Sequence, residues 1–270
     1  MDSAGHDLRA RYAAYRWTPA ASGASGAEVH RLTDTGGALP DLYVKVAAAT
    51  YGLSGEADRL AWLAGRGIPV PRIVERGTDG DVAWLVTEAV PGRPAAERLP
   101  EDRRPAVAEA LADITAALHE LPLADCPFDR SLAVTQAQAV RNVHEGLVAL
   151  DDLDEERAGW SGERLLQVLH RTRPASEDLV VTHGDLTPEN VLIDPETCRV
   201  TGVIDVVRLG RADRHADLAI ALRELASEDD PWFGPECAER FVERYLQRVT
   251  GKVTVDEDRL AFYRLLDEFF

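Results

Sequence analysis

The first third of the chain consists of short apolar runs separated by turn-forming residues. Residues 42–46 alternate apolar and other side chains, as a half-buried strand does, and residues 82–89 form a second apolar run. Between them, residues 54–63 place apolar side chains at helical spacing, with Ser54 in position to cap the helix. The pattern predicts a small, strand-rich N-terminal region with one amphipathic helix.

From Pro105 onward the apolar side chains recur mainly every three or four residues, which is the period of a helix. Pro105 suits the first turn of the first such helix, whose expected core stripe is Val107, Leu111, Ile114 and Leu118. Further helices are predicted near residues 131–149, 161–172, 213–226, 235–248 and 255–268. Short strands are predicted at residues 179–182, 191–194 and 200–205. These elements indicate an α+β protein with a β-rich lobe over residues 1–89 and a mainly helical lobe over residues 90–270.

The most chemically informative residues lie in a loop after the apolar run at 179–181. Asp185 follows His183 by two positions, Asn190 stands five further on, and Asp205 follows fifteen residues later. Phosphoryl transfer uses such a set, because one carboxylate orients the attacking hydroxyl while an amide and a second carboxylate hold Mg²⁺. The arrangement resembles the catalytic loop and metal-binding aspartate of the kinase fold, with HGD in place of HRD. The alternative is that Asp185 and Asn190 only shape a turn.

Lysine is rare in this chain, which makes the position of each lysine informative. Of 30 Lys and Arg residues, only Lys45 and Lys252 are lysine. Lys45 lies on a predicted strand, where a compact ammonium suits a point contact with nucleotide phosphates. Glu56, eleven residues later, lies on the inward face of the predicted helix and therefore needs a cation. We expect Lys45 to be its partner, with the more exposed Asp58 as the alternative partner for the lysine.

Two further segments correspond to nucleotide contacts by position only. Residues 22–29 form a Gly/Ser-rich turn one strand before Lys45, where small residues let the backbone approach a phosphate and Ser25 can donate to it. The turn departs from G-x-G-x-x-G, and a flexible connection is the alternative. In a kinase-like fold, the backbone near Ala89 would form a hydrogen bond with the edge of adenine.

The net charge of −17 is distributed unevenly along the chain. Through Ala95 there are 11 acidic and 10 basic residues, so the remaining 36 acidic and 20 basic residues carry −16. This excludes a nucleic acid bound by charge and favours a polycationic ligand in the second lobe. A generally acidic surface is the alternative, but it does not explain the asymmetry.

Two acidic clusters lie in the second lobe. One spans residues 151–156, where the alternative is a solvated loop, and it includes Asp151, Asp152 and Asp154. The other joins Asp267 and Glu268 to the terminal carboxylate of Phe270 at the C-terminal end of a predicted helix, where the dipole disfavours negative charge. We therefore expect either a cationic ligand or a buried arginine to compensate this second cluster.

Targeting and cysteine patterns limit the location of the protein. The first 17 residues have no apolar signal core, and no run of 18 apolar residues predicts a membrane span. Cys126, Cys198 and Cys237 form no CxxC pair, which is typical of a reducing compartment. We expect a cytoplasmic protein without a membrane partner.

The motifs together resemble the aminoglycoside 3′-phosphotransferases. The likeness extends from about Trp17 to Phe270 and is carried by residues 182–185, 190, 203–205, 208, 212–214 and 265–270. It implies a bilobal protein-kinase-like fold that uses ATP and Mg²⁺. It also implies transfer of the γ-phosphoryl group to the 3′-hydroxyl of kanamycin- or neomycin-like polycations, which confers antibiotic resistance.

The resemblance also assigns roles to residues. It makes Asp185 the catalytic base, Asn190 and Asp205 metal ligands, Lys45 a phosphate contact and Glu56 the group that positions Lys45. The substrate-binding residues that it implies are Asp151, Asp152, Asp154, Arg208, Glu228, Asp267, Glu268 and Phe270. Ser227 departs from the acidic pattern of the family at that loop.

Three other functions are compatible with parts of the sequence. A kinase of the same fold acting on choline or a macrolide would not need the acidic terminus. A metal-dependent phosphohydrolase would use a two-metal cluster drawn from His183, Asp185, Asp205, His215 and Asp217, but it leaves Lys45 and Glu56 unexplained. A non-catalytic antibiotic-binding module would not need Asp185, Asn190 and Asp205 together.

Overall fold

The computed structural model describes residues 3–20, 27–227 and 233–270 of the chain. It divides into two compact units. The first comprises Met1–Arg93, Leu192–Asp194 and Thr201–Val207, and the second comprises Pro94–Val191, Pro195–Val200 and Arg208–Phe270. No helix within the described ranges has the length and apolarity that a bilayer span requires.

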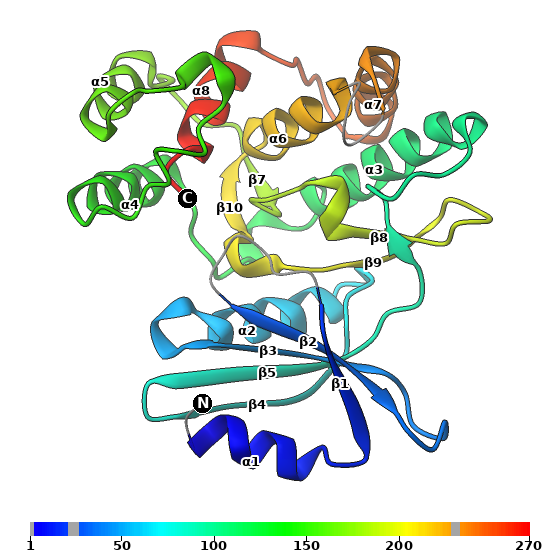
Figure 1. Cartoon of the computed structure of the whole chain (residues 1–270). Coiled ribbons are helices and arrows are strands. Elements are labelled where there is room, and N and C mark those ends of the chain that lie inside the picture. Colours follow the sequence, from blue (N-terminus) through cyan, green and yellow to red (C-terminus); the bar gives the residue numbers. More distant parts are fainter. Residues whose placement is uncertain (1–2, 21–26, 228–232) are drawn as a thin grey trace. The chain divides into compact units, whose positions relative to one another are not determined.

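The first unit is built on a five-stranded antiparallel sheet in the order β1-β2-β3-β5-β4. Its strands are β1 (Tyr15–Pro19), β2 (Glu28–Asp34), β3 (Leu42–Ala48), β4 (Ile73–Asp79) and β5 (Val82–Glu88). Helices α1 (Ser3–Arg11) and α2 (Leu53–Ala64) lie on either side of the sheet (Figure 1). Its core includes Leu32, Leu42, Val44 and Val86, with Trp17 and Trp84 packed against them.

Helix α2 carries the first functional side chain on its buried face. The helix begins at Leu53 with Gly52 in a left-handed conformation at its N-cap, so the prediction that Ser54 caps it was wrong. Glu56 is buried on the same face as Leu60 and Leu63, as the spacing predicted. The helix packs against β4 and β5. Glu56 therefore faces the sheet that contains β3.

The second unit is mainly helical. Its helices are α3 (Arg104–His119), α4 (Leu132–His144), α5 (Gly162–Thr172), α6 (His215–Ala226), α7 (Pro235–Arg248) and α8 (Glu257–Asp267). Helix α3 packs against α7, while α6 packs against α7 and α8. The stripe predicted for α3 is buried as expected at Val107, Leu111, Ile114 and Leu118. A strand-rich unit and a mainly helical unit confirm the predicted α+β class.

Two small sheets complete the fold and carry the loops that matter for function. Strands β7 (Leu179–Thr182) and β10 (Gly210–Asp213) form an antiparallel pair in the second unit. Strands β6 (Arg93–Pro94), β8 (Val191–Ile193) and β9 (Val200–Val203) follow the order β6-β8-β9. Three of the five boundaries between the two units fall within these last three strands.

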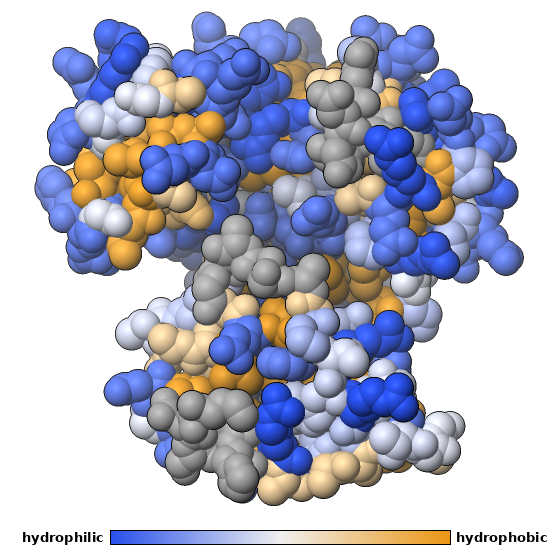
Figure 2. Space-filling view, in the orientation of Figure 1, coloured by the Kyte–Doolittle hydropathy of each residue, from blue (hydrophilic) through white to orange (hydrophobic). Residues whose placement is uncertain are grey.

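Two predicted helices have different bounds in the structure. Helix α4 ends at His144 instead of residue 149, and Gly146 follows in a left-handed conformation with φ 67°. Leu147 and Leu150 are therefore 64% and 40% exposed, and Figure 2 shows apolar residues gathered at the surface over α4 and α5. The helix predicted from residue 213 begins at His215, because residues 210–213 form β10 and pair with β7.

Candidate active site

Lys45 on β3 and Glu56 on α2 form the ion pair that the sequence predicted. Lys45 Nζ lies 2.8 Å from Glu56 Oε1 and 3.2 Å from Asp205 Oδ1. Burial disfavours the ammonium, but the carboxylates of Glu56 and Asp205 outweigh it and raise the pKa of Lys45 above its ordinary value. The lysine is therefore held charged and in a fixed direction. Asp58, the alternative partner, instead pairs with Arg76 at the surface.

Asp205 adopts an unusual backbone conformation. It follows β9 with a φ of 56°, and Cys198 is the other non-glycine residue with positive φ in the described part of the chain. Such a conformation costs energy for a residue with a side chain, although aspartate tolerates it better than most. Its carboxylate is 32% exposed while contacting Lys45. The strained backbone turns this carboxylate toward the lysine of the neighbouring sheet.

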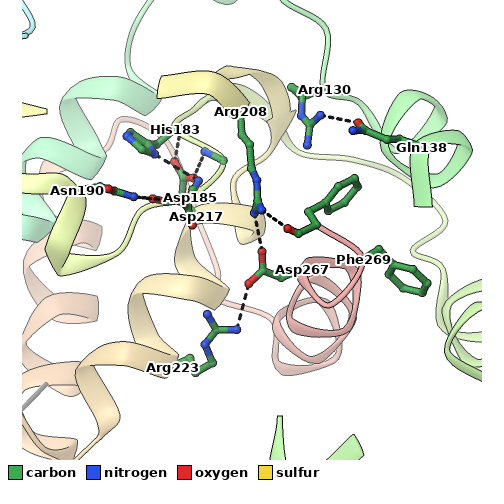
Figure 3. Close-up of polar contacts among 12 residues, drawn as sticks. Arg130, Gln138, His183, Asp185, Asn190, Arg208, Asp217, Arg223, Asp267 and Phe269 are labelled. Carbon is green, nitrogen blue, oxygen red and sulfur yellow. Dashed lines mark hydrogen bonds and ion pairs between the residues drawn. The ribbon is translucent and has the colours of Figure 1, made fainter. Parts of the chain in front are cut away.

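Asp185 and Asn190 are joined within one loop of the second unit. Asn190 ends the short 3-10 helix Pro188–Asn190, and its Nδ2 donates to the main-chain oxygen of Asp185 at 2.8 Å and to Asp185 Oδ2 at 3.0 Å (Figure 3). The second of these hydrogen bonds orients the Asp185 side chain, while the first ties the Asn190 amide to the loop backbone. They also use the amide nitrogen, which leaves the amide oxygen of Asn190 as the atom that can bind a cation.

Asp217 on α6 holds the backbone of the same loop. Its fully buried carboxylate accepts hydrogen bonds from the backbone N–H of His183 and of Gly184, both at 2.8 Å. Gly184 has a φ of 84°, and a Cβ there would lie 2.5 Å from the main-chain oxygen of Arg208. The residue before Asp185 must therefore be glycine, and its position is set from α6. The sequence analysis missed this role.

Asp217 is also held by a buried chain of hydrogen-bonded side chains. Arg214 Nη1 donates to Tyr245 Oη at 2.7 Å, so the tyrosine hydroxyl donates to His119 Nδ1, also at 2.7 Å. His119 then donates from Nε2 to Asp217 Oδ2 at 3.2 Å. Burial raises the pKa of Tyr245 to about 12, which keeps its proton in place. The network links α3, α6 and α7 to the loop that carries Asp185.

The proposed two-metal cluster is not formed by His215 and Asp217. His215 Nδ1 lies 2.7 Å from Asp213 Oδ1, and its Nε2 accepts from the backbone N–H of Asp256 at 3.1 Å. Asp217 is occupied by the loop backbone. Among the residues that the structure describes, no group of three or more His, Cys, Asp or Glu side chains could hold a metal ion. The contacts of His215 and Asp217 thus give both side chains structural partners.

Arginines compensate the acidic C-terminus, which was one of the two expected outcomes. Arg208 donates to Asp267 Oδ1 at 3.0 Å and to the main-chain oxygen of Phe270 at 2.7 Å, while Arg223 donates to Asp267 Oδ2 at 3.1 Å (Figure 3). Glu268 accepts from the buried Arg157 at 3.1 Å, and its side chain is 6% exposed. Burial and the nearby Asp154 raise the pKa of Glu268 above its ordinary value.

The remaining residues predicted from the sequence have varied surroundings. Asp151 and Asp152 are exposed between α4 and α5, whereas Asp154 pairs with Arg157 at 3.0 Å. The backbone N–H of Ala89 donates to the Asp41 main-chain oxygen at 2.8 Å, so that donor is already used. Ser25 and Glu228 lie outside the described residues.

A hollow in the second unit brings the loop and the acidic terminus together. Its lining includes Gly184, next to Asp185, together with Arg208, Asp267 and Phe270. Tyr263 on α8 and Arg130, just before α4, also line it. The acidic terminus therefore lies beside the residue that precedes Asp185.

Comparisons with known proteins identify the family of the chain. The model of the phosphotransferase enzyme family matches residues 16–263. An aminoglycoside 3′-phosphotransferase of Streptomyces fradiae is 60% identical over 268 residues, which are 97% of this chain and 98% of the relative.

Solved structures give the same assignment and extend it to the fold. An aminoglycoside-3′-phosphotransferase of type VIII superimposes with a TM-score of 0.94 at 62% identity, covering 100% of this chain and 99% of the other. Aminoglycoside phosphotransferase APH(3″)-Id of Streptomyces rimosus, solved in complex with ADP and streptomycin, gives 0.80 at 33% identity with the same coverage. The predicted kinase-like fold is confirmed by these neighbours. The chain therefore belongs to the phosphotransferase enzyme family, among the aminoglycoside 3′-phosphotransferases.

Proposed function

We propose that this enzyme transfers the γ-phosphoryl group of ATP to the 3′-hydroxyl of aminoglycoside antibiotics and so confers resistance to them. The observation that carries the proposal is the hollow in which Gly184, beside Asp185, and the acidic terminus at Asp267 and Phe270 line one space. The names of the relatives, aminoglycoside 3′-phosphotransferases, support both the acceptor and the position of transfer.

Asp185 acts as the catalytic base. Its carboxylate, oriented by Asn190 Nδ2 at 3.0 Å, accepts the proton of the acceptor hydroxyl. The oxygen then forms a bond with the γ-phosphorus as the bond to the departing ADP breaks. Asp217 contributes by holding the backbone of His183 and Gly184, so that the carboxylate stands at one fixed position.

The nucleotide is bound by the lobe over residues 1–89. Lys45 contacts the phosphates as a point charge, and Glu56 positions it through the 2.8 Å ion pair. Ser25 and the backbone near Ala89, whose own N–H already donates to Asp41, are the further nucleotide contacts that we propose. The ADP complex of the 33% identical neighbour supports a nucleotide as the donor. Because ATP is the donor, we place the reaction in the cytoplasm.

Mg²⁺ fits the donor atoms that Asn190 and Asp205 offer. An amide oxygen and a carboxylate are hard ligands of the kind that this ion prefers. Asn190 uses its nitrogen on Asp185, and the Asp205 carboxylate is 32% exposed. When bound, the ion neutralises charge on the β- and γ-phosphates.

The acceptor is bound by the lobe over residues 90–270, through carboxylates of which those of Asp154, Asp267 and Glu268 face arginines. The ammonium groups of an aminoglycoside replace guanidinium contacts at this site, while Arg208 keeps Asp267 and Phe270 in place. The carboxylates that we propose for acceptor binding are those of Asp151, Asp152, Asp154, Glu228, Asp267, Glu268 and Phe270. Clustered acidic side chains suit substrates with several ammonium groups.

The decisive experiment compares acceptors that differ in one hydroxyl. The enzyme is incubated with MgATP and either kanamycin A or its 3′-deoxy analogue, and the phosphate is located by NMR. We expect phosphorylation of kanamycin A at the 3′-oxygen and none of the analogue. Equal turnover of the analogue would contradict the position of transfer. Turnover of choline, with none of any aminoglycoside, would refute the acceptor class.

A further inference from the structure

The last two residues of the chain are bound by the second unit much as a ligand is. Phe269 is fully buried, and its main-chain oxygen accepts a hydrogen bond from Asn142 Nδ2 on α4 at 2.7 Å. The main-chain oxygen of Phe270 accepts from Arg208 Nη2 at the same distance. Two side chains from distant parts of the sequence therefore fix two successive oxygens at the end of the chain.

The ring of Phe270 is also held by cations. The guanidinium of Arg130 lies over the ring at 5.2 Å from its centroid, and that of Arg208 lies over it at 5.5 Å. Cations at such distances attract the face of an aromatic ring. Arg130 is itself oriented by Gln138 Oε1 on α4, which accepts from its Nη1 at 2.9 Å (Figure 3). Both the oxygen and the ring of the last residue are thus restrained.

Helix α4 supplies the framework for these contacts. Gln138 and Asn142 stand four residues apart, so they lie on the same face of the helix. One of them orients Arg130 and the other binds Phe269 directly. We call Asn142, Arg130 and Arg208 the C-terminal clasp. The clasp lines one side of the hollow through Arg130 and Arg208, which both border it together with Phe270.

We propose that Asn142 and Arg130 are positioning residues for the acceptor. As part of the C-terminal clasp, they fix the position of the Phe270 carboxylate. This inference rests on the proposed function, since it assumes that the carboxylate receives an ammonium group of an aminoglycoside. The physical reason is that the end of a chain frays unless contacts hold it. A charge that moves cannot present one fixed direction to a polycation, so its contribution to binding falls.

The competing explanation is that Asn142 and Arg130 only pack the end of the chain for stability. The two explanations differ in what the residues control. A role in stability alone lowers the melting temperature and changes both Michaelis constants little. A role in positioning raises the KM for the aminoglycoside while the KM for ATP stays the same.

The test measures kcat, both KM values and the melting temperature for Asn142→Ala and Arg130→Gln in the full-length protein. We expect the aminoglycoside KM to rise about tenfold for Asn142→Ala, which is the equivalent of one good hydrogen bond, and less for Arg130→Gln. The ATP KM should stay within about twofold in both. Arg141→Ala, at an exposed position of the same helix, is the matched control and should change neither constant.

A second experiment tests whether Asn142 acts on the acceptor through the terminal carboxylate. In a protein whose Phe270 carboxylate is amidated, Asn142→Ala should raise the aminoglycoside KM no further, because the charge that it positions is gone. An additive rise, or a joint rise of both KM values, overturns the proposal. If the wild type turns over normally and Asn142→Ala leaves kcat and both KM values unchanged, the proposal is also overturned. Failure of the wild-type enzyme to phosphorylate any aminoglycoside refutes the proposed function itself.

Discussion

The protein contains two sites where ion pairs prepare binding, and they use charge in opposite ways. At β3 and α2, two carboxylates surround the single ammonium of Lys45. At the end of α8, the guanidiniums of Arg208 and Arg223 surround the carboxylate of Asp267. On our proposal, the first site offers a cation to the nucleotide phosphates, and the second offers carboxylates to a cationic acceptor.

The two sites also differ in burial, which determines how easily their partners exchange. Glu56 is 3% exposed at its side chain, so breaking its pair with Lys45 leaves an uncompensated buried charge. Arg223 is 31% exposed, so water and ligand ammonium groups can reach the pair that it forms with Asp267. The Lys45–Glu56 pair is therefore expected to stay formed, whereas the Arg223–Asp267 pair can exchange partners with a bound ligand.

The largest effect is expected for Asp185, which belongs to neither of the two ion-pair sites. Asp185→Asn removes the base, so kcat should fall by about 10²–10⁴-fold while the ATP KM changes only a few-fold. Steady-state kinetics with MgATP and kanamycin A measure both quantities. Near-normal turnover would remove Asp185 from the mechanism. This variant sets the scale against which the two binding sites are compared.

The fixed pair should give the next largest effect. Glu56→Gln removes a buried carboxylate from Lys45, and loss of one partner of such a pair costs about 3–5 kcal/mol. We expect kcat/KM for ATP to fall by about 100-fold or more, with little change in the aminoglycoside KM. Asp58→Asn, two positions away on the exposed face, is the control and should match the wild type. An equal loss in both variants would show that α2 is merely destabilised.

The exchangeable pairs should give a smaller effect that depends on salt. Asp267→Asn should raise the aminoglycoside KM about tenfold, because a hydrogen bond to a charged group contributes about 1.5–3 kcal/mol. The rise of that KM with added salt should also be less steep than in the wild type, since one screened charge pair is missing. Identical salt slopes in the two proteins would show that Asp267 does not face an ammonium group.

A carboxylate outside both sites should affect stability without affecting binding. Burial opposes ionisation of Asp213, but hydrogen bonds from His215 and the Asp178 backbone outweigh it and lower the pKa of Asp213 below 3.8. Its stabilisation is therefore present above pH 3.8 and lost as the pH falls through the lower, folded value. Asp213→Asn should lower the melting temperature at neutral pH by about 6–12 °C, if about 3 kcal/mol is lost.

Melting curves at several pH values, with kinetics at neutral pH, check this last prediction. The difference in melting temperature between the two proteins should shrink below pH 3.8, where the wild type also loses its ionised carboxylate. A constant difference across that range would show that ionisation of Asp213 is not the cause. Changed KM values would show that Asp213 belongs with the binding sites.

The sequence predicted contacts where local patterns determined both partners. The strand alternation around Lys45 and the helical spacing of Glu56 each specify an inward face, so their ion pair was predictable. Contacts between distant segments carried no such signal. Asp217 lies 34 residues from His183, and Asn142 lies 127 residues from Phe269. Their roles became visible only once the helices were packed.

Errors in the predicted elements have physical causes as well. The apolar spacing continues past Gly146, but the left-handed backbone there ends α4 and leaves Leu147 exposed. Pairing with β7 made residues 210–213 a strand, and that pairing joins segments far apart in sequence. Helix α1 and strand β4 were not predicted, since neither has a long apolar stripe. Tertiary contacts, more than local propensity, formed these elements.

If nucleotide and acceptor recognition rest on separate charge arrangements, a double-mutant cycle should show that the two are independent. It measures kcat/KM for ATP and for kanamycin A in the wild type, Glu56→Gln, Asp267→Asn and the double variant. The account predicts that Glu56→Gln acts on ATP, that Asp267→Asn acts on kanamycin A, and that their effects add within about 0.5 kcal/mol. A larger coupling energy, or a changed ATP KM in Asp267→Asn, would contradict the claim.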